Sequence, residues 1–290
     1  MRSGFISIVG KPNVGKSSLL NALIGKHVSI VSDKTETTRT SIVGVYNDPL
    51  HQLIFTDTPG FDKLNYLLNK RSDDIANSSI LDADIVLYVV DRKYNSSDIK
   101  YIERLNKKIP TILVVNKIDQ FLNENNVKDI LNSYLEVYEF LEYYLVSTKE
   151  GIGISPLLES LKAKVKDTIL YYPLDQITNL SFEGVISELV REQIMLNMSE
   201  EIPHQVAVLV ESLEELDYGV YFSRVNIIIE RKAHKGLIIG KNGTMIKKIR
   251  HFAERNIKKT LESDVKLELF VKVVEDWRSK KEILDKLGVY

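Results

Sequence analysis

Short apolar runs recur along the first 170 residues, and polar segments of helical length separate them. Five runs are almost continuously apolar, as is typical of parallel strands covered on both faces, namely residues 5–9, 53–56, 85–90, 111–115 and 144–147. Helices are expected between them, at residues 17–24, 67–80, 98–107, 127–141 and 156–170. The alternation predicts a doubly wound α/β domain, to which residues 41–46 are expected to add an antiparallel strand.

The pattern changes near residue 170, where Tyr171-Tyr172-Pro173 interrupts the last helix. Proline cannot continue a helix without strain, so a linker is expected here. The elements expected after it are a helix at 182–198, strands at 204–210 and 224–230, a glycine-containing loop at 236–243 that opens a helix to about 261, a strand at 265–273 and a helical segment at 277–287. We therefore expect three parts: a first domain at 1–170, a linker and connecting helix at 171–199, and a smaller α+β domain at 200–290.

Charge divides the chain in the same way. The whole chain of 290 residues has a net charge of −1, which by itself argues against a nucleic-acid binder. Residues 220–290, however, hold 17 Lys and Arg against 9 Asp and Glu, while the preceding residues hold 22 against 31. Such asymmetry indicates a basic module appended to an acidic one.

Composition excludes several classes of protein. The chain has no cysteine, so disulfides, thiolate metal sites and cysteine nucleophiles are ruled out. No apolar run approaches the ~18 residues of a membrane span, and the apolar stretch at 5–9 is too short for a secretory signal. We expect a cytoplasmic protein.

A phosphate-binding motif follows the first strand. The motif G-x-x-x-x-G-K-[ST] matches Gly10, Lys11, Pro12, Asn13, Val14, Gly15, Lys16 and Ser17, and Ser18 continues into the expected helix. Glycines let backbone N–H groups face phosphate oxygens at a helix N-terminus. Lys16 would bridge the β- and γ-phosphates, and the Ser17 hydroxyl would bind Mg²⁺. The alternative, a chance glycine turn, does not explain the strand before and the helix after the motif.

A second motif is suited to reading a guanine base. Asn116, Lys117 and Asp119 follow the apolar strand at 111–115. The Asp119 carboxylate can accept hydrogen bonds from guanine N1–H and its 2-amino group, whereas adenine would leave it unpaired, which can discriminate by ~10⁴. Asn116 would support the loop, and the Lys117 stem would cover the base. Ser147 and Thr148, after the next strand, would supply backbone contacts to guanine O6 or simply form a turn.

Two further segments fit the magnesium and switch regions of such a site. Asp57-Thr58-Pro59-Gly60 ends the strand at 53–56, so that Asp57 would hold the Mg²⁺ shell and the Gly60 N–H would contact the γ-phosphate. Loss of that contact on hydrolysis would release the following segment. Thr38, within the polar segment 35–39, is the expected second hydroxyl ligand of Mg²⁺, unless this segment is only a surface loop.

The ordered set Gly10–Ser17, Thr38-Arg39, Asp57–Gly60 and Asn116–Asp119 resembles the translation-factor-type GTPases of the Era/TrmE group. Phe61 stands where Ras-like proteins have a glutamine that orients the attacking water, so the resemblance implies slow intrinsic hydrolysis. Potassium-dependent members of the group use an asparagine at the position of Asn13 to bind K⁺, but Asn13 could equally form a turn. Arg39 is expected to contact phosphate or the switch surface rather than act as an arginine finger.

The basic module contains a loop typical of RNA binding. Residues 231–259 hold 10 Lys and Arg and one acid, Glu254. Within them lies Gly240-Lys241-Asn242-Gly243, a G-x-x-G loop of the kind that in KH domains clamps single-stranded nucleotides. Charge alone could indicate a solvated helix face, but charge and loop together favour RNA. The candidate RNA-binding residues are Lys235, Gly236, Ile239, Gly240, Lys241, Asn242, Gly243, Lys247, Lys248 and His251.

The order of elements around this loop resembles a type II KH domain, and together with the first domain the resemblance extends to the Era family over nearly the whole chain. The family resemblance implies a P-loop GTPase that uses GTP, GDP and Mg²⁺, with K⁺ in some members. It implies binding near the 3′ end of 16S rRNA during 30S subunit assembly, with RNA bound in the GTP state and released after hydrolysis. We expect a monomer, with peripheral contact at the inner membrane surface as a further possibility.

Three other functions stay open at this point. An ATP-using phosphotransferase with a basic tail is opposed by Asn116 and Asp119. An RNA chaperone or scaffold with a structural nucleotide site is opposed by the complete set of phosphate and Mg²⁺ groups. A membrane-associated GTPase would use its basic helix on anionic lipid instead of RNA. Phe270 and Trp277 could stack on bases, but we expect both to pack in the core.

Overall fold

The structure is a computed structural model of the chain, and it describes residues 1–31, 42–57, 79–121, 123–198, 202, 205–217 and 219–287. The described residues form two compact units, which meet along the chain between Asn179 and Leu180. The helix expected at 67–80 lies outside the described residues except for its last two positions.

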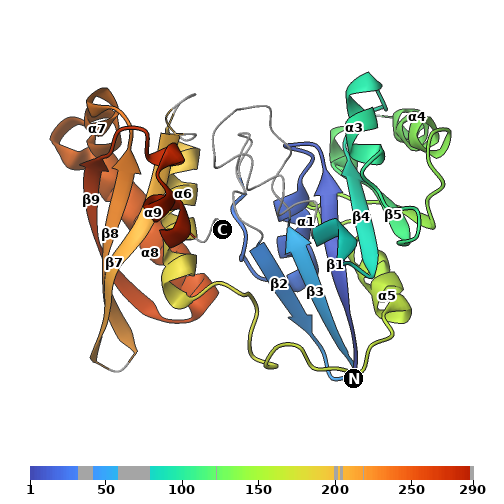
Figure 1. The fold of residues 1–290 in the computed structure, drawn as a ribbon, viewed down its shortest axis with the longest axis horizontal. Helices are drawn as coiled ribbons and strands as arrows, with labels where there is room; N and C mark the ends of the chain where they lie inside the picture. Colours follow the sequence, from blue (N-terminus) through green and yellow to red (C-terminus); the bar gives the residue numbers. More distant parts are fainter. Residues whose placement is uncertain are drawn as a thin grey trace. The chain divides into compact units, whose positions relative to one another are not determined.

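The first unit is built on a six-stranded sheet in the order β2-β3-β1-β4-β5-β6, of which β2, β3, β1, β4 and β5 are labelled side by side in Figure 1. Only β2 is antiparallel to its neighbour, and the other neighbouring pairs are parallel. The elements are β1 (Arg2–Gly10), α1 (Lys16–Ile24), β2 (Ile42–Asn47), β3 (His51–Asp57), β4 (Ile85–Val90), η1 (Ser96–Asp98), α3 (Ile99–Ile102), β5 (Thr111–Val115), η2 (Ile118–Gln120), α4 (Glu124–Leu135), β6 (Glu142–Leu145) and α5 (Ile154–Lys164).

The core of this unit lies on both faces of the sheet. Every residue of β4 is buried. Val86, Tyr88 and Val90 join a cluster with residues of α3 and α4 on one face, and because side chains alternate along a strand, the residues between them face the other side. There α1 contacts α5, β1 and β3. The predicted doubly wound arrangement is confirmed.

Several predicted helices end earlier in the structure. In place of the helix expected at 98–107 the structure has η1 and the four-residue α3, which ends at Ile102. The Asn95 and Asp98 side chains cap each other's backbone in a capping box that begins η1. The helix expected at 156–170 ends at Lys164. From there the chain extends and pairs with β1, where Ser3 N donates to Asp167 O at 2.7 Å.

Residues 171–179 form part of the expected linker, and in the structure they hydrogen-bond to β2 and β3. The side-chain oxygen of Gln52 accepts from the backbone N–H groups of Tyr171 at 2.9 Å and Tyr172 at 3.0 Å. Thr178 forms a bridge to Gly44. The domain bounds expected from the sequence stay a prediction, and the structure adds that this segment is held by the first unit.

The second unit contains a three-stranded sheet in the order β7-β8-β9 (Figure 1). β7 is antiparallel to β8, and β9 is parallel to it. The elements are α6 (Phe182–Asn197), β7 (Val206–Asp217), β8 (Val220–Ile229), α7 (Lys232–Ile239), η4 (Lys241–Gly243), α8 (Thr244–Leu261), β9 (Asp264–Val273), η5 (Trp277–Ser279) and α9 (Lys281–Lys286). The expected order of helix, two strands, loop, helix and strand is present, and the structure adds helix α7 before the loop.

The core of the second unit joins α6 and α8 to one face of this sheet. Ile249, Ala253 and Ile257 form the buried stripe of α8 that the spacing of apolar residues predicts. On the opposite face, Trp277 packs with Ile228 and is fully buried. Phe270 departs from the prediction of core packing, since 40% of its surface is exposed.

The glycine-containing loop expected at 236–243 is shorter in the structure. Residues 236–239 belong to helix α7, and only Gly240 to Gly243 form the loop. The fully buried side chain of Ile238 anchors α7 in the core, and this packing outweighs the unfavourable helix propensity of Gly236. Among the described residues, no helix is both long and apolar enough to cross a membrane.

Candidate nucleotide site and nucleic-acid interface

The P-loop connects β1 to α1, as the motif predicts. Gly15 lies at the N-cap of α1 with φ of +94°, and a Cβ atom there would overlap Nδ2 of Asn116. A Cβ atom on Gly10 would overlap the backbone oxygen of Val89. Both glycines are therefore required for the loop to wrap closely against the ends of β4 and β5.

Lys16 occupies a buried position at the start of α1. Only 8% of its surface is exposed, and its ammonium donates to the backbone oxygens of Gly10 at 3.1 Å and Lys11 at 3.0 Å. Burial lowers the pKa of Lys16, although the nearby Asp57 carboxylate works in the opposite direction. The Lys16 ammonium is thus a buried cation. An anionic ligand bound in the loop would offset the free-energy cost of burying this charge.

Asp57, at the end of β3, lies next to the P-loop serine. Its carboxylate is fully buried, and Oδ2 accepts from the hydroxyls of Ser17 at 2.6 Å and Ser29 at 2.9 Å. A hydroxyl and a carboxylate beside a phosphate loop fit Mg²⁺, which takes few protein ligands and keeps waters and phosphate oxygens. Among the described residues, no three His, Cys, Asp or Glu gather to hold a metal. The 2.6 Å hydrogen bond shows that the structure brings the predicted pair Ser17 and Asp57 together.

The base-reading motif is attached directly to the P-loop. Asn116 is fully buried, and its Nδ2 donates to Val14 O at 2.9 Å while its Oδ1 accepts from Thr148 N at 3.3 Å. Lys117 has a φ of +60° and donates to the backbone oxygen of Asn13. Asn116 and Lys117 therefore fasten the loop after β5 to the P-loop.

Asp119 is held by the next loop of the sheet edge. The hydroxyl of Ser147 donates to Asp119 Oδ1 at 2.5 Å, and the same hydroxyl accepts from Glu150 N at 3.1 Å. The sequence prediction gave Ser147 only a backbone role, so this side-chain contact was missed. Ser147, Thr148 and Asp119 are nevertheless brought together as expected.

Asp91 and Ser29 are site residues that the sequence analysis did not identify. Asp91 follows β4 and accepts from Lys117 Nζ at 3.0 Å and from Arg92 Nε at 2.8 Å. Burial alone would raise the pKa of Asp91, but the hydrogen bonds from Arg92 and Lys117 hold it below its usual value. The available signal was an aspartate directly after a buried strand, at the sheet edge where ligands bind in α/β folds.

Five expected residues of the switch segments lie outside the described residues. They are Thr38, Arg39, Thr58, Pro59 and Gly60, and Phe61 lies there as well. Their assigned roles stay predictions.

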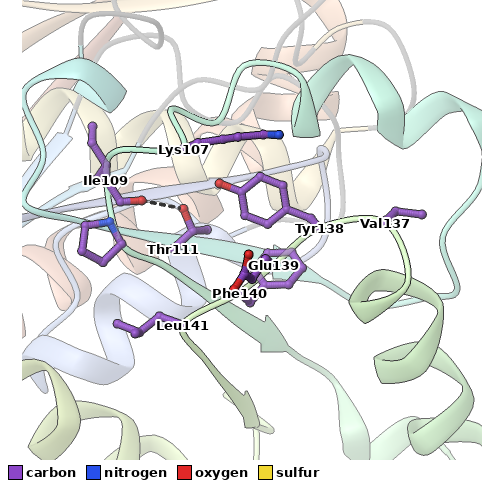
Figure 2. Close-up of a pocket in the computed structure, with 9 residues that line it drawn as sticks. Lys107, Ile109, Thr111, Val137, Tyr138, Glu139, Phe140 and Leu141 are labelled. Carbon is purple, nitrogen blue, oxygen red and sulfur yellow. Dashed lines mark hydrogen bonds between the residues drawn. The ribbon is translucent and has the colours of Figure 1, made fainter.

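A groove of about 550 Å³ lies at the other end of β5 (Figure 2). Lys107, Tyr138 and Phe140 line it, and Thr111 donates from its hydroxyl to Ile109 O at 3.2 Å. Thr111 is the first residue of β5, whereas Asn116 follows its last residue. The groove is therefore separate from the nucleotide site.

In the second unit, the G-x-x-G loop joins α7 to α8. Gly240 has φ of +72° and ψ of 168°, and a Cβ atom there would lie 2.7 Å from Cβ of Met245. Gly243 has φ of +73° and lies at the N-cap of α8, while Lys241 and Asn242 between the two glycines are exposed. The loop therefore presents two polar side chains next to the positive end of a helix.

The candidate RNA-binding side chains surround this loop. Lys247, Lys248 and His251 lie on the exposed side of α8, away from its buried stripe. Lys235 and Gly236 are exposed on α7, and Ile239 is half-buried and packs against the core. The structure thus places the predicted residues on α7, the loop and the first half of α8.

Comparison with known proteins identifies a family for each part of the chain and for the chain as a whole. A family model described as a 50S ribosome-binding GTPase matches residues 5–117, and a KH domain model matches residues 201–278. GTPase Era of Clostridium kluyveri is 40% identical over 291 residues, covering 99% of both chains. The chain belongs to the Era family of GTPases. GTPase Era of Fusobacterium nucleatum is likewise 40% identical over 292 residues.

Solved structures of Era agree with this assignment. A variant of Aquifex aeolicus Era bound to GDP and AlF₄⁻ matches with a TM-score of 0.94 and 34% identity, covering 100% of this chain and 99% of that one. Era in complex with MgGDPNP and nucleotides 1506–1542 of 16S ribosomal RNA matches with a TM-score of 0.93, at the same identity and coverage. Era-family membership confirms the predicted GTPase activity and the predicted fold class, a P-loop GTPase domain followed by a KH domain.

Proposed function

We propose that this Era-family chain binds GTP with Mg²⁺, hydrolyses the GTP, and binds 16S rRNA near its 3′ end during assembly of the 30S subunit. The observation that carries the proposal is the presence in one chain of a P-loop that contacts Asp57 and Asn116 and of a G-x-x-G loop in the second unit. Support comes from the solved Era complex with MgGDPNP and 16S rRNA nucleotides 1506–1542, which matches over the full chain. The cytoplasm is the expected compartment.

In this proposal the nucleotide contacts come from the P-loop and the two base-reading loops. Lys16 and the backbone N–H groups of residues 10–18 bind the phosphates, and Ser17 binds Mg²⁺ with Asp57 beside it. Asn116, Lys117 and Asp119 bind guanine, with Ser147 and Thr148 next to them. Thr38 and residues 58–60 complete the Mg²⁺ and γ-phosphate contacts, and Asn13 is the place where K⁺ would bind.

Hydrolysis would then proceed by attack of water on the γ-phosphate. The charge that develops on the phosphate oxygens is stabilised by Lys16 and Mg²⁺, because preorganised cations in a dry site cost no reorganisation when the bond breaks. Phe61 has no hydrogen-bonding side chain to orient the water, so a slow intrinsic rate is expected.

The proposed RNA site lies on the second unit. Gly240 and Gly243 let the sugar-phosphate backbone approach closely, and Lys241, Lys247 and Lys248 neutralise phosphates. The nucleotide and RNA sites then belong to the domains proposed from the sequence, 1–170 and 200–290, which the segment 171–199 connects.

Equilibrium binding to two RNAs tests the proposal. A labelled oligonucleotide with the 3′-terminal sequence of 16S rRNA is compared with a scrambled oligonucleotide of equal length and composition, in the presence of GDPNP and Mg²⁺. Preference for the 16S sequence by about tenfold or more is expected, since specific binding exceeds non-specific binding by larger factors. Equal affinity for the two RNAs would overturn the assignment of the RNA target.

Single-turnover hydrolysis tests the nucleotide half. The wild-type chain should release phosphate from GTP, and Lys16→Ala should release it much more slowly because the variant lacks the cation beside the β- and γ-phosphates. Equal rates in both proteins would favour an RNA-binding scaffold with a structural nucleotide site.

A further inference from the structure

The ammonium of Lys11, in the phosphate loop, contacts three polar side chains of the segment 95–98. Its ammonium lies 2.7 Å from Asp98 Oδ1, 2.7 Å from Ser97 Oγ and 3.3 Å from Asn95 Oδ1. A lysine ammonium has three N–H donors, and these three acceptors account for all of them. The side chain of this P-loop residue is thus engaged by the segment between β4 and α3.

The Asp98 side chain is buried, and both of its carboxylate oxygens have a partner. Only 1% of its side chain is exposed, against 17% for Lys11. Its second oxygen accepts from Asn95 N at 2.9 Å, which closes the capping box at η1. A carboxylate held this way presents a fixed charge to Lys11, because moving it would leave an unpaired charge in a buried place.

The backbone of Lys11 is part of the phosphate site itself. Its carbonyl oxygen accepts from the Lys16 ammonium at 3.0 Å. One residue therefore contacts the phosphate-binding lysine through its main chain and the Asp98 carboxylate through its side chain.

We infer that Asp98 is a positioning residue for nucleotide binding, which acts through Lys11 to hold the first half of the P-loop in the shape that receives phosphates. Asp98 lies outside each nucleotide motif, and it touches no nucleotide group in this role. The inference rests on the proposed nucleotide site and adds to it a support that the motif does not contain. In this inference the Lys11 side chain stabilises the shape of the P-loop and does not bind the phosphates.

A double-mutant cycle on guanine-nucleotide affinity tests this inference. The variants are Lys11→Met, Asp98→Asn and the combination of both, and the readout is the dissociation constant for fluorescent GDP and GDPNP at fixed Mg²⁺. Each single change is expected to weaken binding of both nucleotides about tenfold, and the double variant by about the same factor as one change, because coupled residues are not additive. Lys11→Arg should retain affinity, since arginine keeps the charge and the donors.

The matched control is a salt bridge of the same unit that is exposed to solvent. Lys93 and Asp129 lie 2.8 Å apart with side chains 60% and 54% exposed, and Lys93→Met and Asp129→Asn should leave both affinities unchanged. Because Asp98→Asn could impair folding, Ser97→Ala supplies a milder change that removes one acceptor of Lys11 and leaves Asp98 in place. This variant is expected to weaken binding about two- to threefold and to keep the melting temperature of the nucleotide-free protein.

Three results would overturn the inference. They are unchanged affinity in every variant, simple additivity of the two single changes, and tighter binding by Asp98→Asn, which would mean that the released Lys11 ammonium binds phosphate. Failure of the proposed function gives a different result, because the wild-type chain itself would then not bind guanine nucleotides.

Discussion

The hydroxyl of Ser147 donates a hydrogen bond of 2.5 Å to Asp119 Oδ1, and this bond joins the loop after β6 to the loop after β5. Ser147 is fully buried, whereas Asp119 is exposed, so the bond fixes one side of a carboxylate that stays open to a ligand. The carboxylate proposed to read guanine is therefore oriented by a neighbouring loop. Preorganisation of this kind is expected to raise affinity, because less freedom is lost on binding.

Ser147→Ala should accordingly weaken binding of GTP and GDP by about tenfold, which is about 1.4 kcal/mol. The lost interaction is a hydrogen bond to a charged acceptor, the stronger class of hydrogen bond in proteins. Titration with fluorescent GDP measures the effect. Ser160→Ala is the control, because the Ser160 hydroxyl donates to Glu142 at 2.7 Å, outside the base-reading motif. Equal affinity of Ser147→Ala and the wild type would show that Asp119 needs no such support.

Gly15→Ala should abolish measurable binding of guanine nucleotides, because the added methyl would overlap Nδ2 of Asn116. Gly25→Ala is matched in backbone strain, since Gly25 at the end of α1 also has a positive φ of 76°. Nothing lies within 4 Å of a Cβ atom at Gly25. Gly25→Ala should thus lose about 1 kcal/mol of stability and keep its nucleotide affinity. Calorimetric titration distinguishes the two, and equal loss in both variants would contradict the predicted contact.

Lys16→Met should melt a few degrees higher than the wild type at pH 7.5 when both are free of nucleotide. Burial lowers the pKa of Lys16 in the folded protein, so the unfolded chain binds more protons than the folded one between that lowered pKa and 10.5. The free energy of unfolding of the wild type therefore rises with pH across that window. The difference in melting temperature between Lys16→Met and the wild type should shrink from pH 7.5 to pH 10. About 1 kcal/mol corresponds to roughly 2–4 °C for a unit of this size. A lower melting temperature for the variant at pH 7.5 would refute the prediction.

Gly243→Asp should weaken binding to the 16S oligonucleotide by about tenfold or more and leave GDP affinity unchanged. Space for the side chain exists, because the nearest atom to a Cβ there is 4.0 Å away, so the effect would come from a negative charge in the phosphate path. Gly219→Asp is the matched control, since Gly219 has a φ of +77° and open space around it. A filter-binding assay in which both variants bind RNA equally well would contradict the role of the loop.

Lys247→Gln combined with Lys248→Gln should reduce the dependence of RNA affinity on salt. Each phosphate contact to single-stranded nucleic acid contributes about 0.7 to the slope of log K against log salt, so the slope should fall by about 1.4. Binding is measured between 50 and 200 mM salt, and Lys266→Gln on β9 is the control at an exposed lysine outside the candidate set. An unchanged slope would remove these two lysines from the interface.

The features predicted correctly from sequence are those encoded locally. The P-loop is a contiguous strand, turn and helix, and the positive φ values of Asn13 and Gly15 arise within it. Asn116 and Asp119 directly follow an apolar strand, so parallel topology alone brings them to the P-loop edge. The buried stripe of α8 follows from a spacing of three or four residues.

The features that were missed depend on partners distant in the chain. Ser29 and Asp98 carry no motif of their own, and their partners Asp57 and Lys11 are 28 and 87 positions away. Gly236 is expected in the loop at 236–243, but tertiary packing of Ile238 fixes it in α7. The burial of Phe270 was also predicted wrongly. Its aromatic side chain predicts burial, but β9 places it on a partly exposed face of the sheet.

Crosslinking of the chain to RNA in living cells, followed by sequencing of the bound RNA, tests the central claim most directly. We expect crosslinks to concentrate near the 3′ end of 16S rRNA in the wild type and to fall sharply in Gly243→Asp. Crosslinks spread over unrelated RNAs, or equal in the wild type and Gly243→Asp, would contradict a G-x-x-G-dependent role in 30S assembly.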